Sequence, residues 1–253
     1  MNRRLFVYEW HNVVGNVLTI LFGLCFPVFM SLLFTRVYSQ GLPHMVVLEI
    51  NTSIFLTMMM IAPLSTMFIG YAATYSQEVE NDIPTRLELF GLHGRSVLLA
   101  KLFANGVFLV ATAVIYIAIG MTAIDMYKPA ISGIFFSLLA IILVGGILLI
   151  FAHGIVMICL RFSTTYAVTM TLYFAIMVLC GMMGVQVSQF PDWIQHIAKL
   201  LPMTYMGMSS TSGFIHVWRG QNFQAGSFLL SLVFLLAAAL LVLGVSRWKN
   251  RRR

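Results

Sequence analysis

Residues 131–160 read ISGIFFSLLAIILVGGILLIFAHGIVMICL, a run of thirty residues without a single Asp, Glu, Lys or Arg. A helix rises about 1.5 Å per residue, so a helix of this run is longer than the roughly 30 Å hydrocarbon core of a bilayer. The whole chain has the same character, because 60% of its 253 residues are hydrophobic and 9% are charged. Soluble domains carry about 25% charged residues. We therefore expect an integral membrane protein.

Further apolar runs on both sides of this stretch predict six membrane-spanning helices in one transmembrane domain over residues 1–253. Short joints near Lys128 and Arg161 predict antiparallel helix hairpins. The fold class that we expect is an all-α integral membrane protein. The expected spans are 13–35, 50–75, 102–124, 131–160, 164–187 and 227–246.

The distribution of Lys and Arg predicts which ends of these helices face the cytoplasm. With the amino terminus inside, eleven cations fall on the cytoplasmic side and four fall outside. The two groups are Arg3, Arg4, Arg86, Arg95, Lys101, Arg161, Arg247, Lys249, Arg251, Arg252 and Arg253 inside, and Arg36, Lys128, Lys199 and Arg219 outside. We expect both termini in the cytoplasm. Basic residues scattered in this way do not form the single basic surface of a nucleic-acid-binding protein.

Three segments outside the spans predict shorter helices. Residues 76–101 hold four of the chain's eight acids and, after Pro84, an amphipathic pattern that predicts a short cytoplasmic helix parallel to the membrane. Residues 188–226 have helical apolar spacing but are too short to span, which predicts interfacial or re-entrant pieces broken at Pro202. The aromatic and basic residues at the start of the chain predict a short interfacial helix.

Sequence patterns for catalysis are missing from the chain. It has no His-Glu-x-x-His zinc pattern and no glycine-rich phosphate loop, so we expect no catalytic, cofactor or metal site and no ATP hydrolysis by this chain alone. His153 is the most central titratable residue, and a hydrogen bond to a neighbouring helix is favoured over a proton relay, which needs partner acids. Hydroxyl and amide side chains in the spans either line a substrate path or form hydrogen bonds between helices, and the sequence leaves both interpretations open.

Two stretches follow the pattern of a known family: the acid-rich residues 78–91 with residues 97–101 that follow, and the proline and aromatic element at 201–205. In these stretches the sequence resembles the permease subunits of type-2 ATP-binding-cassette exporters. The chain departs from the family at 81–85, where Asn-Asp-Ile-Pro-Thr stands in place of Arg-x-x-Gly-Thr. The resemblance covers nearly the whole chain and implies a single transmembrane permease domain over residues 1–253.

The resemblance also implies a mechanism. Two permease chains, identical or related, bind separate ATP-binding subunits that hold ATP and Mg, and a cytoplasmic coupling helix between spans two and three transmits their closure. The residues expected to contact the ATP-binding subunit are Glu80, Asp82, Arg86, Glu88, Phe90, His93 and Arg95. Spans one, two and five line the path in the family, which gives as path candidates Asn16, Thr57, Ser65, Thr66, Thr169 and Gln186.

The expected function is therefore export of a hydrophobic or amphipathic substrate, such as a drug, peptide or lipid, from the cell through the inner, cytoplasmic membrane. The preference for apolar cargo depends on the scarcity of charges in the spans and on the 17 methionines, whose flexible thioethers suit varied apolar ligands. Alternatives are a secondary carrier driven by an ion gradient, which usually needs acids at the membrane midplane, and a membrane immunity protein.

Overall fold

The computed structural model describes residues 3–208 and 213–251, apart from the side chains of Leu18, Arg95, Asn250 and Arg251. The described residues form helices and loops, without a strand. In chain order the helices are α1 (Arg3–Val14), α2 (Val17–Ile20), η1 (Leu21–Cys25), α3 (Phe26–Tyr38), α4 (His44–Met59), α5 (Ile61–Pro63), η2 (Leu64–Gly70), α6 (Tyr71–Glu80), α7 (Ile83–Leu89), α8 (Gly94–Ala123), α9 (Ile131–Cys159), α10 (Phe162–Leu179), η3 (Val187–Gln189), α11 (Asp192–Ala198), η4 (Pro202–Tyr205), α12 (Phe214–Trp218) and α13 (Ala225–Arg251).

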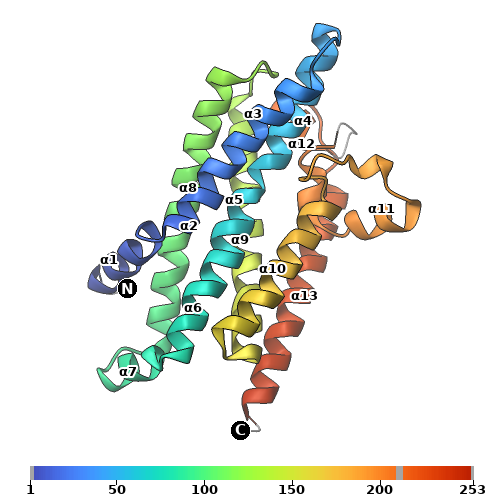
Figure 1. The fold of residues 1–253 in the computed structure, drawn as a ribbon. Helices are drawn as coiled ribbons and strands as arrows, with labels where there is room; N and C mark the ends of the chain where they lie inside the picture. Colours follow the sequence, from blue (N-terminus) through green and yellow to red (C-terminus); the bar gives the residue numbers. More distant parts are fainter. Residues whose placement is uncertain (1–2, 209–212, 252–253) are drawn as a thin grey trace.

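Six helical segments in the described part of the chain are long and apolar enough to cross a membrane (Figure 1). This confirms the expected all-α class and the number of spans, and the chain is a multi-pass membrane protein. Figure 1 places α1, α7 and the last turns of α13 toward one end of the bundle. The segments are Leu21–Tyr38, His44–Glu80, Ser96–Ala123, Ile131–Cys159, Phe162–Leu179 and Ala225–Lys249.

The second and third spans are longer than the apolar runs predict. The α6 helix continues to Glu80 and α8 already begins at Gly94, so only residues 81–93 lie between them. Charged residues lie in the added turns of both helices. Lys101 lies inside α8 rather than at its start, and acidic side chains neutralise it there. The long connection expected at 76–101 is therefore mostly helix.

The fifth span ends earlier than predicted. The α10 helix stops at Leu179, and Gly181 and Gly184 then take left-handed backbone conformations with φ of +75° and +87°. Glycine adopts this conformation without the steric cost that other residues incur, and it commonly ends a helix. Gln186 therefore lies in the loop after the helix, and its predicted place inside the fifth span is wrong.

The second span forms the centre of the bundle. From Phe55 to Tyr71 most of its side chains are buried, including Leu56, Leu64 and Phe68 with no exposed surface. The α9 helix packs along η2 and α6 on one side and along α13 on the other. The middle of the second span is thus covered by neighbouring helices, whereas its first turn, at Met45, is exposed.

At the opposite end of the bundle from α7, the short helix α12 folds back into the interior. Trp218 is fully buried, its indole nitrogen donates to the Tyr127 carbonyl at 2.8 Å, and its ring lies 5.6 Å from that of Phe55. The α11 helix instead exposes Trp193, which is 66% accessible. Pro202 begins η4 between these two helices, where the sequence predicts a break.

Candidate functional site

The α7 segment, which we define as residues 81–93, projects from the bundle between α6 and α8 (Figure 1). Asp82 precedes the helix in a left-handed conformation with φ of 56°, and Gly91 follows it with φ of +80°. These two turns isolate a short helix whose last residues face outward. Leu89 and Phe90 are each 84% exposed, an apolar pair that is surrounded by exposed charged residues.

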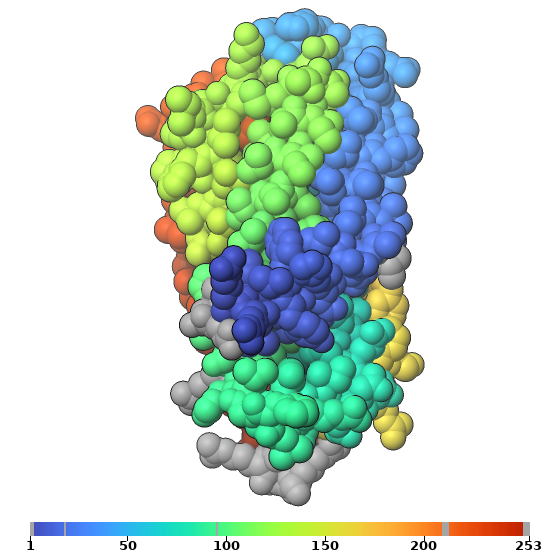
Figure 2. Space-filling view, turned by 90° about the vertical axis from the view of Figure 1, so that its left-hand side faces the viewer, coloured from blue at the N-terminus to red at the C-terminus, as the bar shows by residue number. Residues whose placement is uncertain are grey.

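The inner side of the α7 segment is anchored to two neighbouring helices. Leu87 and Leu92 pack against Leu5 of α1 and against Val97 and Ala100 of α8. Figure 2 shows α1, in dark blue, lying directly above the teal segment that contains α7. The α7 segment is therefore in side-chain contact with both α1 and the first turns of α8.

Next to this apolar anchor is a buried ion cluster, formed by Glu9, Glu78 and Lys101. The Lys101 ammonium nitrogen lies 2.9 Å from Glu9 Oε2 and 2.6 Å from Glu78 Oε1, and the side chains of Lys101 and Glu9 are 3% and 2% exposed. Asn12 donates to the same Glu78 oxygen at 3.3 Å. The cluster joins α1, α6 and α8, three helices that are far apart in the sequence.

The ion cluster carries one more negative than positive charge. Within the described residues Glu9 Oε1 is buried and has no hydrogen-bond partner. Burial raises the pKa of the Glu9 carboxyl above its usual 4.5, and the neighbouring Lys101 charge opposes that increase. Glu9 is thus the weakly held member of the cluster.

Sequence reasoning missed this cluster because its members stand at the borders of three different apolar runs. One signal was available. Leu5, Glu9 and Val13 follow one another at intervals of four residues and are the buried residues of α1, so Glu9 lies in the apolar stripe of an amphipathic helix. A carboxylate in that position needs a cation from another element.

Most residues predicted to contact an ATP-binding subunit lie together on the α7 segment or beside it. Glu80 and Phe90 are exposed, as is Arg86 between them, and the Arg95 side chain lies outside the described residues. Glu80 also stabilises the start of α10, because its Oε2 accepts a hydrogen bond of 2.8 Å from the backbone N–H of Phe162. The other exposed members are Asp82, Glu88 and His93.

The predicted path residues are mostly buried within the chain. Thr57, Ser65, Thr66 and Thr169 are at most 9% exposed, and each hydroxyl donates to a carbonyl of its own helix three or four residues earlier. Asn16 is half-buried at the corner between α1 and α2, where its side-chain oxygen accepts the Thr19 N–H at 3.4 Å. Four of the six predicted path residues are thus buried in the interior of the bundle, whereas Gln186 is exposed in its loop.

Two π-helical turns meet in this interior. The η1 turn in the first span contacts η2 in the second, and a Cβ added to Gly23 of η1 would lie 2.7 Å from the Thr66 methyl of η2. Pro27 follows η1 and Pro63 precedes η2, and each lacks the N–H that a regular helix requires. Wide turns of this kind are frequent at functional sites. Here η2 contains the predicted path residues Ser65 and Thr66.

His153 is held by neighbouring aromatic residues. Its Nδ1 lies 2.8 Å from the Tyr71 hydroxyl of α6, and its ring stacks on Tyr75 at 5.2 Å. The predicted hydrogen bond to a neighbouring helix is present. The methionine run Met58–Met60 is at most 2% exposed and fills the core.

Comparison with known proteins gives one match. A family model described as ABC-2 type transporter matches residues 3–215, which is most of the chain and includes the α7 segment, the ion cluster and both π-helical turns. No curated protein matches the sequence.

Proposed function

This chain belongs to the ABC-2 type transporter family, and from that premise we propose that it is the permease subunit of an ATP-driven exporter. Proteins with this membrane domain serve as transport permeases and generally work with an ATP-binding subunit. In our proposal the ATP and Mg are held by that separate subunit, and the cargo is hydrophobic or amphipathic. The complex lies in the inner, cytoplasmic membrane, with both termini of this chain in the cytoplasm.

The observation that supports the proposal best is the α7 segment. A water-facing end of a membrane protein rarely presents two neighbouring apolar side chains that are 84% exposed, as Leu89 and Phe90 are, unless a partner covers them. The exposed charges around the pair, such as Arg86 and Glu88, suit a polar rim, which is common around the core of a protein interface.

The contacts behind the α7 segment support transmission of movement. Closure of the ATP-binding subunits would press on α7, and Leu87 would transmit the displacement to α1 and α8. The ion cluster then ties α8 and α1 to α6, the last part of the second span. ATP binding would thereby bias the first three spans between two arrangements.

The transport path in this proposal lies between two permease chains, identical or related. The hydroxyls of Ser65 and Thr66 are buried where the first and second spans meet, so they would reach the path only when those spans separate. The described interior of the spans has few charges, which favours apolar or amphipathic cargo over small ions.

The proposal is tested by replacing the exposed apolar pair. We expect Leu89→Ser with Phe90→Ser to abolish co-purification with a co-expressed ATP-binding subunit, because the partner loses the apolar centre of its interface. The charge reversal Arg86→Glu with Glu88→Arg should weaken the same association. Trp193→Ser, which changes another exposed aromatic, at the other end of the bundle, serves as the control.

Association and ATPase activity are measured on the purified complexes. The proposal requires loss of both in the Leu89→Ser with Phe90→Ser variant and a decrease of both in the charge-reversed variant, with the Trp193→Ser variant unchanged. If a folded wild-type chain binds no ATP-binding subunit, the exporter assignment fails and a carrier or an immunity protein becomes the better candidate.

A further inference from the structure

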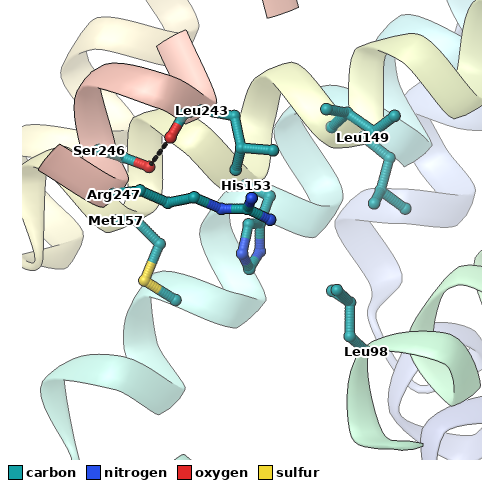
Figure 3. Close-up of a pocket in the computed structure, with 8 residues that line it drawn as sticks. Leu98, Leu149, His153, Met157, Leu243, Ser246 and Arg247 are labelled. Carbon is teal, nitrogen blue, oxygen red and sulfur yellow. Dashed lines mark hydrogen bonds between the residues drawn. The ribbon is translucent and has the colours of Figure 1, made fainter. Parts of the chain in front are cut away.

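An open-sided pocket of about 430 Å³ lies between α8, α9 and α13, near the end of the bundle that carries α7 (Figure 3). Its size falls within the roughly 300–1,000 Å³ of typical ligand pockets. Most of its wall is apolar, from Leu98 of α8, from Leu149, Ile150 and Met157 of α9, and from Leu243 of α13. The pocket is separate from the α7 segment and from the predicted path residues.

One cation stands at the edge of this apolar wall. Figure 3 shows the Arg247 side chain reaching from α13 across the pocket, with its guanidinium end over the His153 ring and Leu98 on the far side of the opening. Among the described residues no carboxylate lies within ion-pair distance of Arg247, since the ion pairs found there belong to Lys101. The guanidinium donors therefore face the pocket without an anionic partner from the described part of the chain.

His153 adds a second donor. Its Nδ1 is occupied by the Tyr71 hydroxyl at 2.8 Å, whereas Nε2 has no hydrogen-bond partner among the described residues. When the Tyr71 hydroxyl donates to Nδ1, the neutral imidazole carries its proton on Nε2. Ser246 contributes less, because its hydroxyl donates to the Leu243 carbonyl at 2.7 Å.

A ligand that satisfies both parts of the pocket has an anionic head and a long apolar tail. We propose that the pocket binds one anionic glycerophospholipid, with its phosphate at Arg247 and His153 and an acyl chain along Leu98, Ile150 and Leu243. Arginine binds phosphate oxygens through paired N–H groups. Basic pockets between membrane helices on the cytoplasmic side are typical sites for anionic lipid headgroups.

The pocket walls favour a lipid over free phosphate. A free anion would satisfy Arg247 but would leave the part of the pocket lined by Leu98, Leu149, Ile150 and Leu243 unfilled, whereas the acyl chain of a lipid fills it. The surrounding bilayer supplies the lipid at high local concentration, and the pocket is open on one side to admit it. This inference does not require the exporter assignment, since it depends only on a membrane-embedded chain.

The test uses the purified full-length chain in nanodiscs that contain equal fractions of phosphatidylglycerol and phosphatidylcholine, with native mass spectrometry of the lipids retained. We expect the wild type to retain phosphatidylglycerol preferentially. Arg247→Gln should lower its apparent affinity roughly tenfold, the factor expected for loss of one charge-assisted hydrogen bond. Arg247→Lys should lose less, because it keeps the charge but not the paired geometry.

Two further variants separate the parts of the site. Arg161→Gln removes an exposed cation near the same end of the bundle but outside the pocket, and it should leave retention unchanged. Leu98→Trp fills the apolar part and should release the bound lipid even though Arg247 remains.

Two results would overturn the proposal. One is equal retention of the two lipids together with no effect of Arg247→Gln in protein whose circular dichroism spectrum matches the wild type. The other is competition by inorganic phosphate with no effect of Leu98→Trp, which would indicate a phosphate site instead of a lipid site.

Discussion

Lys101 illustrates how a charge is kept inside an otherwise apolar bundle. Its ammonium group is shared by two carboxylates, of which Glu78 lies closer at 2.6 Å and also accepts a hydrogen bond from Asn12. Glu9, at 2.9 Å, has a buried oxygen without a partner among the described residues. Removing different members of the cluster should therefore have unequal effects.

Replacement of Lys101 by Met should cost about 3–5 kcal/mol of unfolding free energy, because two buried carboxylates then lose the ammonium group with which they pair. Glu9→Gln should change it by no more than about 1 kcal/mol, since the pair of Lys101 and Glu78 remains and the excess charge is removed. Unfolding in mixed micelles by added sodium dodecyl sulfate measures both. Equal losses in the two variants would contradict this account of the cluster.

Thr66 tests the predicted path at the level of one side chain. It has no exposed surface in this structure, so Thr66→Cys in a background without Cys25, Cys159 and Cys180 should resist a water-soluble thiol reagent at rest. If the first and second spans separate during transport, labelling should rise several-fold when the complex hydrolyses ATP.

Ser137→Cys provides the control, because Ser137 of α9 is equally buried but is not a path candidate. Labelling of both cysteines to the same extent would indicate general loosening of the fold, and labelling of neither would remove Thr66 from the path.

At the scale of elements, close packing against the neighbouring helices fixes the position of α9. Its Gly154 lies against α13, where an added Cβ would come within 3.0 Å of the Leu243 backbone nitrogen and 2.9 Å of a Val242 methyl. Gly146, two turns earlier on the same helix, has no atom within 4 Å of that position. The sequence alone does not distinguish these two glycines.

Gly154→Ala should therefore destabilise the protein by about 1–3 kcal/mol, because backbone contacts force α9 and α13 apart. Gly146→Ala should be neutral or stabilising by up to about 1 kcal/mol, since alanine favours a helix over glycine. Thermal unfolding in detergent, followed by circular dichroism, compares the two. A lower midpoint for Gly146→Ala than for Gly154→Ala would contradict the packing that the structure gives.

At the scale of the whole molecule, the orientation in the membrane stays a prediction from the charge distribution. Six spans bring α1, α7 and the end of α13 to one end of the bundle (Figure 1), and the excess of Lys and Arg at that end predicts that it faces the cytoplasm. The exposed turn between α3 and α4 then lies outside.

Thiol labelling of intact cells tests this orientation. In a cysteine-free background, Gln40→Cys in the exposed turn should react with a membrane-impermeant reagent, whereas Thr85→Cys on α7 should react only after the cells are permeabilised. Both positions are exposed in the structure, so accessibility to water is matched. The reverse pattern would invert the topology and remove α7 as a contact for a cytoplasmic subunit.

The sequence by itself determined the class of the fold and the number of spans, because lipid as a solvent requires long apolar helices and these are read directly from the hydropathy of the chain. The family followed from the resemblance of residues 78–91, 97–101 and 201–205, and not from composition. It also located the short helix after Pro84, since local amphipathic spacing is a property of neighbouring residues. Only the tertiary structure joined Glu9, Glu78 and Lys101, buried Thr66 against Gly23, and placed Arg247 beside His153. These are contacts between residues that are distant in the chain, which a local sequence pattern does not show. The helix ends at Glu80, Gly94 and Leu179 likewise depend on such contacts and on backbone turns, and hydropathy does not predict them.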